Sequence, residues 1–331
     1  MNNFRKTVPG LGSGKLRQIL FGIPTYFQQV TQLRTRRSFY RWLYFKFPYF
    51  FEMADFPQFI ILSVTTRCNL SCPHCFRNIM YWRPYDMELH LFEKLLDELA
   101  MHPECTLKLG GMGEPSVHPK IRDFIFLLAE KKVPTIIFTN GMLFERFSPH
   151  EIVELGFNRL VVSIDGIDEQ SYKSIRVGGN YATLKENVAR LRQIREGLKS
   201  RRPQIEIRHV ILPNESSKDL MNFRQDWLEF ADTVMWCNLV PLSPKPRGDS
   251  APIFKRCRAI RRVFSIGPEG QVPICMVNSW RSTTEEMLGD LHDATIQELW
   301  KHPRLQYLRK CHEDSVLDNV PFCKDCKEIT E

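Results

Sequence analysis

Residues 68–75 read Cys-Asn-Leu-Ser-Cys-Pro-His-Cys, and this stretch decides the fold and the chemistry that the chain predicts. Its thiols, Cys68, Cys72 and Cys75, have the spacing C-x₃-C-x₂-C. Thiolates are the usual ligands of iron–sulfur clusters, and a cubane cluster takes four of them. With three ligands from one loop, one iron keeps an open coordination position, as a catalytic zinc ion does. The spacing therefore predicts a cluster that can bind a small chelating molecule and pass it an electron.

Two other interpretations of the triplet are a zinc knuckle and three buried core thiols. The flanking sequence favours the cluster. Residues 58–65 read QFIILSVT, an apolar run typical of a buried strand, and the Cys loop follows directly. A second strand near 106–109 runs into the sequence GGMGEP, residues 110–115. Its glycines let backbone approach a ligand, and Glu114 supplies a carboxylate for an ammonium group.

Strand-like and helix-like runs alternate along the chain, which predicts an α/β fold with a parallel sheet. The predicted strands lie near 58–65, 105–109, 134–138, 159–164, 205–211 and 233–240. The predicted helices lie near 87–101, 119–131, 149–155, 183–199 and 216–230. Six units are too few for a complete eight-fold barrel, so we expect a partial (β/α)6 TIM-like barrel with an open side.

A second group of cysteines lies beyond a Pro- and Gly-containing linker at 243–248. We expect four ligands there: Cys257, Cys275, Cys323 and Cys326. Structural zinc and an iron–sulfur cluster fit this spacing equally well. Cys311 is a further candidate whose spacing fits less well, while Cys105 and Cys237 adjoin strands and are predicted to be core thiols.

On the basis of these motifs, the chain resembles the radical S-adenosylmethionine (SAM) superfamily over about residues 56–242. The resemblance rests on the Cys triplet, GGMGEP, IIFTN at 136–140 and LVVSIDG at 160–166, followed by Arg176. It implies that SAM binds the open iron of a [4Fe–4S] cluster through its amino and carboxylate groups. Residues implied to line the methionine end are Gly110, Gly111, Gly113, Glu114 and Pro115. Those implied to reach the ribose or carboxylate are Asn140, Ser163, Asp165 and Arg176, and His74 has the position that faces the adenine.

The C-terminal cysteines resemble a SPASM or shortened "twitch" domain, whose C-x₉₋₁₅-G-x₄-C element matches Cys257, Gly270 and Cys275. A full SPASM domain has seven Cys and two auxiliary clusters. No Cys follows Cys326 in this sequence, so we expect one auxiliary cluster, of the [4Fe–4S] type. The resulting division is an extension at 1–55, a barrel at 56–243 and a cluster domain at 244–331.

The resemblance implies reductive cleavage of SAM to a 5′-deoxyadenosyl radical that takes hydrogen from a substrate. Enzymes with such C-terminal domains often oxidise a peptide, or a sugar or other alcohol, and need an external electron donor of the flavodoxin or ferredoxin type. The alternative is a non-catalytic nucleic-acid-binding protein stabilised by zinc or iron–sulfur centres. It explains the cysteines but not GGMGEP or the barrel-like alternation. The sequence does not identify the substrate.

The composition fits a cytoplasmic enzyme of 331 residues. Ten Cys, several with metal-ligand spacing, indicate a reducing compartment, and we expect neither a signal peptide nor a membrane-spanning segment. The formal net charge of +8 is interpreted as a solvated surface, since no nucleic-acid-binding module is recognised. The basic, aromatic stretch at 34–51 fits a peripheral membrane contact, but we favour docking onto the barrel.

Overall fold

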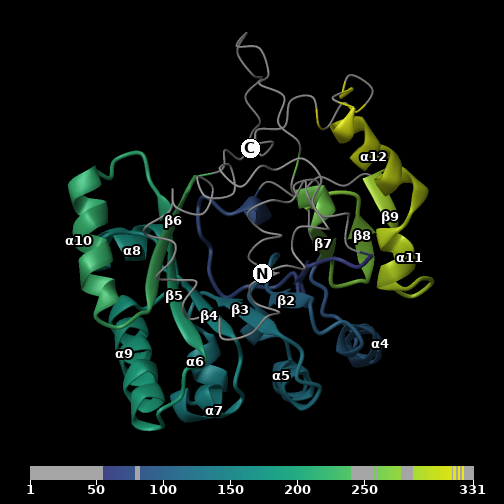
Figure 1. The fold of residues 1–331 in the computed structure, drawn as a ribbon. Coiled ribbons are helices and arrows are strands. Elements are labelled where there is room, and N and C mark those ends of the chain that lie inside the picture. Colours follow the sequence, from purple (N-terminus) through teal and green to yellow (C-terminus); the bar gives the residue numbers. More distant parts are fainter. Residues whose placement is uncertain are drawn as a thin grey trace, which may run out of the picture. The chain divides into compact units, whose positions relative to one another are not determined.

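A single parallel sheet organises the chain (Figure 1). The computed structural model describes residues 55–78, 83–239, 257, 259–276, 286–314, 316, 317, 320 and 323. The sheet has the order β6-β5-β4-β3-β2-β1-β7, and each neighbouring pair is parallel. The strands are β1 (Phe59–Leu62), β2 (Thr106–Leu109), β3 (Thr135–Thr139), β4 (Arg159–Ser163), β5 (Gln204–Ile211), β6 (Thr233–Asn238) and β7 (Val263–Ile266). The predicted α/β class and partial barrel are confirmed.

Helices cover one face of the sheet. They are α4 (Leu89–Ala100), α5 (Ile121–Glu130), α6 (Leu143–Arg146), α7 (Pro149–Glu154), α8 (Glu169–Ile175), α9 (Tyr181–Gly197) and α10 (Ser217–Leu228). Several begin where the sequence supplies an N-cap. The side chains of Ser148, Asp168 and Ser216 each accept a hydrogen bond from the third helical N–H in a capping box.

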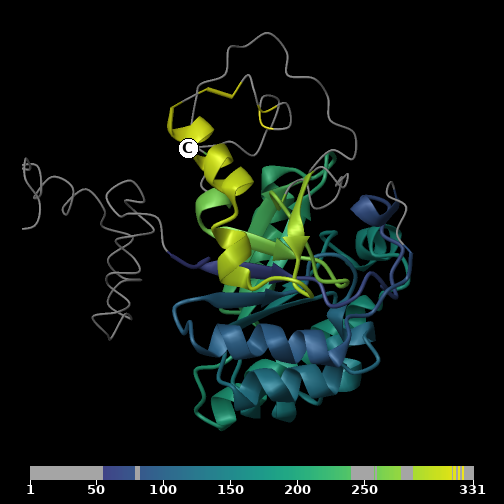
Figure 2. The ribbon, with the colours of Figure 1, turned by 90° about the vertical axis from the view of Figure 1, so that its right-hand side faces the viewer.

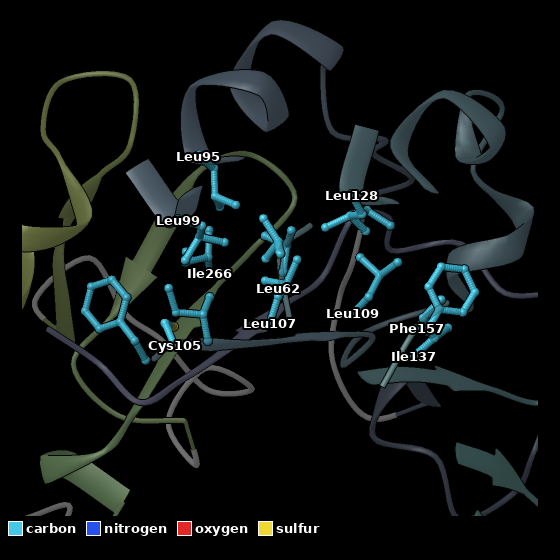
Figure 3. Close-up of a cluster of buried hydrophobic side chains, with 14 of the residues drawn as sticks. Leu62, Leu95, Leu99, Cys105, Leu107, Leu109, Leu128, Ile137, Phe157 and Ile266 are labelled. Carbon is cyan, nitrogen blue, oxygen red and sulfur yellow. The ribbon is translucent and has the colours of Figure 1, made fainter. Parts of the chain in front are cut away.

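The main core lies between these helices and the sheet, because strand side chains alternate between its two faces. Leu95 and Leu99 of α4 point toward Leu62 and Leu107 of the sheet, as Figure 3 shows. Each of these four side chains is at most 2% exposed. Cys105 is fully buried in the same core, which confirms its prediction as a core thiol.

The C-terminal part continues the sheet. Strand β7 pairs with β1, and beyond it come β8 (Gln271–Pro273), β9 (Met287–Asp290), α11 (Ile296–Trp300) and α12 (Pro303–Glu313). Figures 1 and 2 show these elements beside the β7 edge. The Glu98 carboxylate of α4 accepts hydrogen bonds from the N–H groups of Ile296 and Gln297, at 2.8 and 2.9 Å. It thereby caps α11 from another element, and this contact ties the C-terminal part to the barrel.

The prediction of Cys237 as a core thiol is wrong, because this side chain is exposed. It lies on edge strand β6, on the opposite face from Val234, which is 5% exposed. Short strand β7 was not predicted. The three-part division stays a prediction; residues 1–54, the 243–248 linker and Cys326 lie outside the described residues. No helix in the described part of the chain is long and apolar enough to cross a membrane.

Candidate metal and cofactor site

The Cys loop leaves the carboxyl end of β1 and folds back on itself. The Cys75 N–H donates to the Cys72 carbonyl at 3.1 Å, and the Leu70 N–H donates to the Cys68 sulfur at 3.4 Å. Burial raises the pKa of the Cys68 and Cys72 thiols, and repulsion from the Cys75 sulfur adds to both increases. A cationic metal centre removes this penalty, since metal-bound thiols are deprotonated. The three soft donors therefore fit an iron–sulfur cluster.

Among the described residues, no three Cys, His, Asp or Glu side chains lie close enough together to hold one metal ion.

The loop at residues 110–115 packs directly against the start of the Cys loop. Gly113 has φ +72°, and a Cβ there would lie 2.5 Å from the carbonyl oxygens of Thr65 and Arg67. The next residue, Glu114, donates its N–H to the Arg67 carbonyl at 2.8 Å. Only glycine permits this approach, so the Gly-rich loop joins the two halves of the site. Gly110 and Gly111 are equally confined, by Phe138 and Ser63, and the buried Pro115 begins the 3₁₀ turn η3 (Pro115–Val117).

Glu114 is buried, and its carboxylate connects the ends of neighbouring strands. Its Oε1 accepts hydrogen bonds from the hydroxyls of Ser116 and Thr139, at 2.7 and 2.8 Å, and its Oε2 accepts one from the Asn140 N–H at 2.7 Å. Burial raises the pKa of this carboxyl, and the hydrogen bonds oppose that increase. A carboxylate offers about four acceptor sites, so Oε2 retains capacity for another donor.

Asn140, directly after β3, contacts the Cys loop. Its side-chain amide donates to Asn69 Oδ1 at 2.9 Å and lies 3.7 Å from the Cys68 sulfur. Its Oδ1 accepts the Met142 N–H at 3.0 Å. This side chain therefore holds the first cysteine of the triplet in place from a neighbouring strand end.

Asp165 forms the other link between the Cys loop and the strand ends. Its buried Oδ2 lies 2.6 Å from an Arg176 guanidinium nitrogen and 3.2 Å from His74 Nε2, while its Oδ1 accepts the Val210 N–H at 2.8 Å. Burial raises the pKa of Asp165, but the hydrogen bond with His74, the Arg176 charge and the Val210 N–H outweigh burial and hold it below its usual value. Ser163 is half-buried at the end of β4. The predicted cofactor residues thus converge on the Cys loop from successive strands; their contacts with SAM stay predictions.

The C-terminal cysteines meet around a histidine that the sequence reasoning missed. His312 of α12 is buried, and its Nδ1 accepts the Cys257 N–H at 3.4 Å while its Nε2 lies 3.4 Å from the Cys323 sulfur. Burial and the nearby Arg261 lower the pKa of His312, which favours the neutral ring. Because Nδ1 accepts, the proton of that ring lies on Nε2 and points at the sulfur. The only feature of the sequence that could have indicated His312 is its position directly after Cys311.

The remaining C-terminal cysteines lie in the same part of the fold. Cys257 and Cys275 are half-buried against the core, and Cys311 is buried in α12. Soft sulfur donors from separate segments fit an auxiliary cluster, while the ligand set itself stays a prediction.

Two family models match the chain. The model of the radical SAM superfamily matches residues 62–226, and that of the SPASM iron–sulfur cluster-binding domain matches residues 257–327.

Curated relatives support the same assignment. A cofactor-modifying protein of the tungsten-containing aldehyde ferredoxin oxidoreductase from Pyrococcus furiosus is 30% identical over 58% of this chain and 54% of its own length. The Fe-coproporphyrin III synthase of Methanosarcina barkeri is 27% identical over 48% of this chain and 45% of its own length. The chain thus spans about half the length of the curated relatives it matches.

Solved structures share the fold at low sequence identity. Streptococcus suis SuiB bound to S-adenosylmethionine has a TM-score of 0.63 at 13% identity, covering 89% of this chain and 80% of that one. BtrN, in complex with AdoMet and 2-DOIA, has a TM-score of 0.52 at 14% identity, covering 82% and 92%. The two family models, together with the Cys loop, the Gly-rich loop and the parallel sheet, show that the chain belongs to the radical SAM superfamily and carries a C-terminal SPASM iron–sulfur domain.

Proposed function

We propose that this protein is a radical SAM enzyme that oxidises a peptide, or a sugar or other alcohol. The observation that carries the proposal is the convergence of Cys68, Cys72 and Cys75 with the Gly-rich loop and the Asp165–Arg176 pair at the carboxyl ends of neighbouring strands. The family's cofactors are SAM, a [4Fe–4S] cluster that binds it, and an auxiliary iron–sulfur cluster in the SPASM domain. When bound, the [4Fe–4S] cluster would pass one electron from an external donor to SAM, and breaking of the C5′–S bond would give methionine and a radical that takes a hydrogen atom from the substrate.

The chain's own residues would then position and shield the reactants. Glu114 has acceptor capacity at Oε2 for the SAM ammonium, and Arg176 is suited to a carboxylate or hydroxyl. The buried Asp165 fixes both Arg176 and His74, so that the loop and the strand ends keep one geometry. His312 would hydrogen-bond a sulfur ligand of the auxiliary cluster, which we propose as the acceptor of the second electron.

Both substrate classes are found among proteins of the same fold. SuiB was solved with its precursor peptide, and anSMEcpe with the Cp18Cys peptide, whereas BtrN was solved with 2-DOIA. A PqqA peptide cyclase is 23% identical over 42% of this chain. The electron donor that we propose is a flavodoxin or ferredoxin.

The test is anaerobic reconstitution followed by assay of SAM cleavage with dithionite. We expect a brown protein containing iron and sulfide that releases 5′-deoxyadenosine and methionine. Replacing Cys68, Cys72 and Cys75 together by Ala should abolish this release while the auxiliary cluster remains. Cys105→Ala is the matched control, because this buried core thiol belongs to neither ligand set. A colourless zinc protein, or cleavage that persists in the triple variant, would contradict the proposal.

A further inference from the structure

The inner face of the sheet, opposite the helices, carries an unusual set of charges. Side chains alternate across each strand, and those facing the helices are apolar and fully buried, such as Leu107, Leu160 and Ile207. Their neighbours on the other face are Lys108 of β2, Arg159 of β4, and Glu206 and Arg208 of β5. In an ordinary barrel this interior is packed with bulky branched side chains. Here solvent reaches it, since the Arg159 and Arg208 side chains are 39% and 38% exposed.

The cations on this face outnumber its carboxylates in the described part of the chain. Glu206 alone pairs with both arginines: its Oε2 lies 2.6 Å from Arg159 and its Oε1 lies 2.5 Å from Arg208. Arg262, just before β7, adds a further positive charge near Lys108. Among the described residues, Glu206 thus faces Lys108, Arg159 and Arg208. Such an excess of positive charge on a partly enclosed face attracts anions.

Lys108 is the least compensated of these groups. Its ammonium lies 4.3 Å from the centre of the Phe59 ring, and no ion pair joins it to a carboxylate among the described residues. Burial, followed by repulsion from Arg208 and Arg262, lowers the pKa of Lys108 to about 8. Glu206 acts in the opposite direction, and Arg159 adds to the decrease. The ammonium is still mainly protonated at neutral pH.

The backbone of Lys108 and of Arg208 lies close to the strand ends that carry the site residues. Lys108 precedes Gly110 by two residues, which corresponds to about 6–7 Å along a strand. Arg208 lies on β5, three strands along the sheet from β2. Its carbonyl accepts a hydrogen bond at 2.9 Å from the N–H of Ile164, the residue before Asp165. The backbone at both cations therefore lies within two residues of those ends, while the Lys108 ammonium leans over Phe59, which pairs with Thr106 at the start of β2.

We propose that Lys108 and Arg208 bind an anionic group of the substrate, a carboxylate or a phosphate, on the inner face of the sheet. The inference rests on the proposed function, because it names the chemical class of the substrate for that site. An anion held there leaves the remainder of the substrate directed toward the carboxyl ends of the strands, where hydrogen abstraction would occur. Arg159 and Arg262 add to the positive potential, and Glu206 orients Arg208.

The test measures anion binding without turnover. Reconstituted protein is saturated with SAM, so that the carboxylate site of the cofactor is filled, and no reductant is added. Calorimetric titrations at low ionic strength then use inorganic phosphate in one arm and succinate in the other. We expect saturable binding, weakened about tenfold or more in Lys108→Met and in Arg208→Gln, since a charge-assisted contact is lost. Lys108→Arg should retain binding, and Lys218→Met, at an exposed site on α10, should match the wild type.

The outcomes separate this proposal from the proposed function. Tighter phosphate binding would indicate a phosphoester and tighter succinate binding a carboxylate; either supports an anionic substrate. Absent binding to the wild type, or variants of Lys108 and Arg208 that are folded by circular dichroism and bind normally, would overturn the inference. So would an equal loss in Lys218→Met, which would indicate non-specific attraction. Failure of the wild type to cleave SAM with dithionite would instead contradict the proposed function, because binding is measured without cleavage.

Discussion

At the scale of the residue, Glu114 combines a structural and a binding role in one carboxylate. It accepts hydrogen bonds from Thr139 and Asn140, across from β2 to the end of β3. Glu114→Gln should weaken SAM binding about tenfold or more with the first cluster retained, because a charge-assisted contact contributes about 1.5–3 kcal/mol. Equilibrium titration of SAM measures this. Thr139→Val removes one structural bond but keeps the carboxylate; an equal loss of affinity in that variant would make Glu114 a positioning residue only.

Lys108 should reveal a conflict between substrate binding and stability. Its ammonium is desolvated in the native state, so Lys108→Met should raise the free energy of unfolding by about 2 kcal/mol at pH 7. The groups that face it are Arg159, Glu206, Arg208 and Arg262, and none of them is changed. Anaerobic thermal unfolding of the loaded protein measures the effect as a rise of several degrees in Tm.

The same variant has a defined pH dependence. Native Lys108 loses its proton near pH 8, whereas the lysine of the unfolded chain loses it near 10.5. Between these values the unfolded state binds more protons, so wild-type stability gains with rising pH. The advantage of Lys108→Met should therefore shrink as pH rises from 8 toward 10. An advantage that is constant with pH, or a destabilised variant, would show that the ammonium is not desolvated.

At the scale of the element, helix α12 places a histidine, His312, beside a cysteine of the C-terminal set. His312 directs a ring N–H at the Cys323 sulfur. Hydrogen bonds to cluster sulfurs raise the reduction potential, so His312→Ala should make the auxiliary cluster harder to reduce. Potentiometric titration monitored by electron paramagnetic resonance, in the background that lacks Cys68, Cys72 and Cys75, isolates that cluster. His312→Gln can donate the same bond and should recover much of the potential; an unchanged potential in His312→Ala would contradict the assignment.

The sequence predicted elements better than contacts. The six strands from 58–65 to 233–240 were predicted because their apolar runs are distinct, and each appears as one of β1 to β6. Strand β7 was missed because Val263–Ile266 gains its partner, β1, from a distant part of the chain. Cys237 was misplaced because a strand pattern does not show which face of an edge strand lacks a cover.

The candidate site shows the same limit. The Cys triplet and GGMGEP were found by spacing. Of the hydroxyl donors to Glu114, Ser116 is two positions away, but Thr139 is 25 positions away and only the fold brings it close. The contact between His312 and Cys323 likewise depends on how α12 lies. Spacing identifies ligands that are close in sequence, whereas the side chains that orient them come from separate elements.

At the scale of the whole molecule, the two cysteine sets are joined through one continuous sheet. The Cys loop follows β1, and the C-terminal part adds β7 to the other side of the same strand, with Ser63 donating its N–H to Ile266 at 3.0 Å. A shared strand gives the two cluster sites a fixed relation.

The last prediction separates the roles of the two sites. Replacing Cys323 and Cys326 by Ala should preserve uncoupled cleavage of SAM and stop formation of the oxidised product, because the second electron loses its acceptor. Since binding energy at a site absent from the unfolded chain becomes folding energy, the variant should also unfold at a lower temperature. Cys105→Ala again serves as the control, and circular dichroism establishes that the variant is folded before turnover is compared. A folded variant that forms product at the wild-type rate would make the auxiliary cluster a structural centre only, while the loss of both activities would show that the C-terminal site supports the barrel through β7.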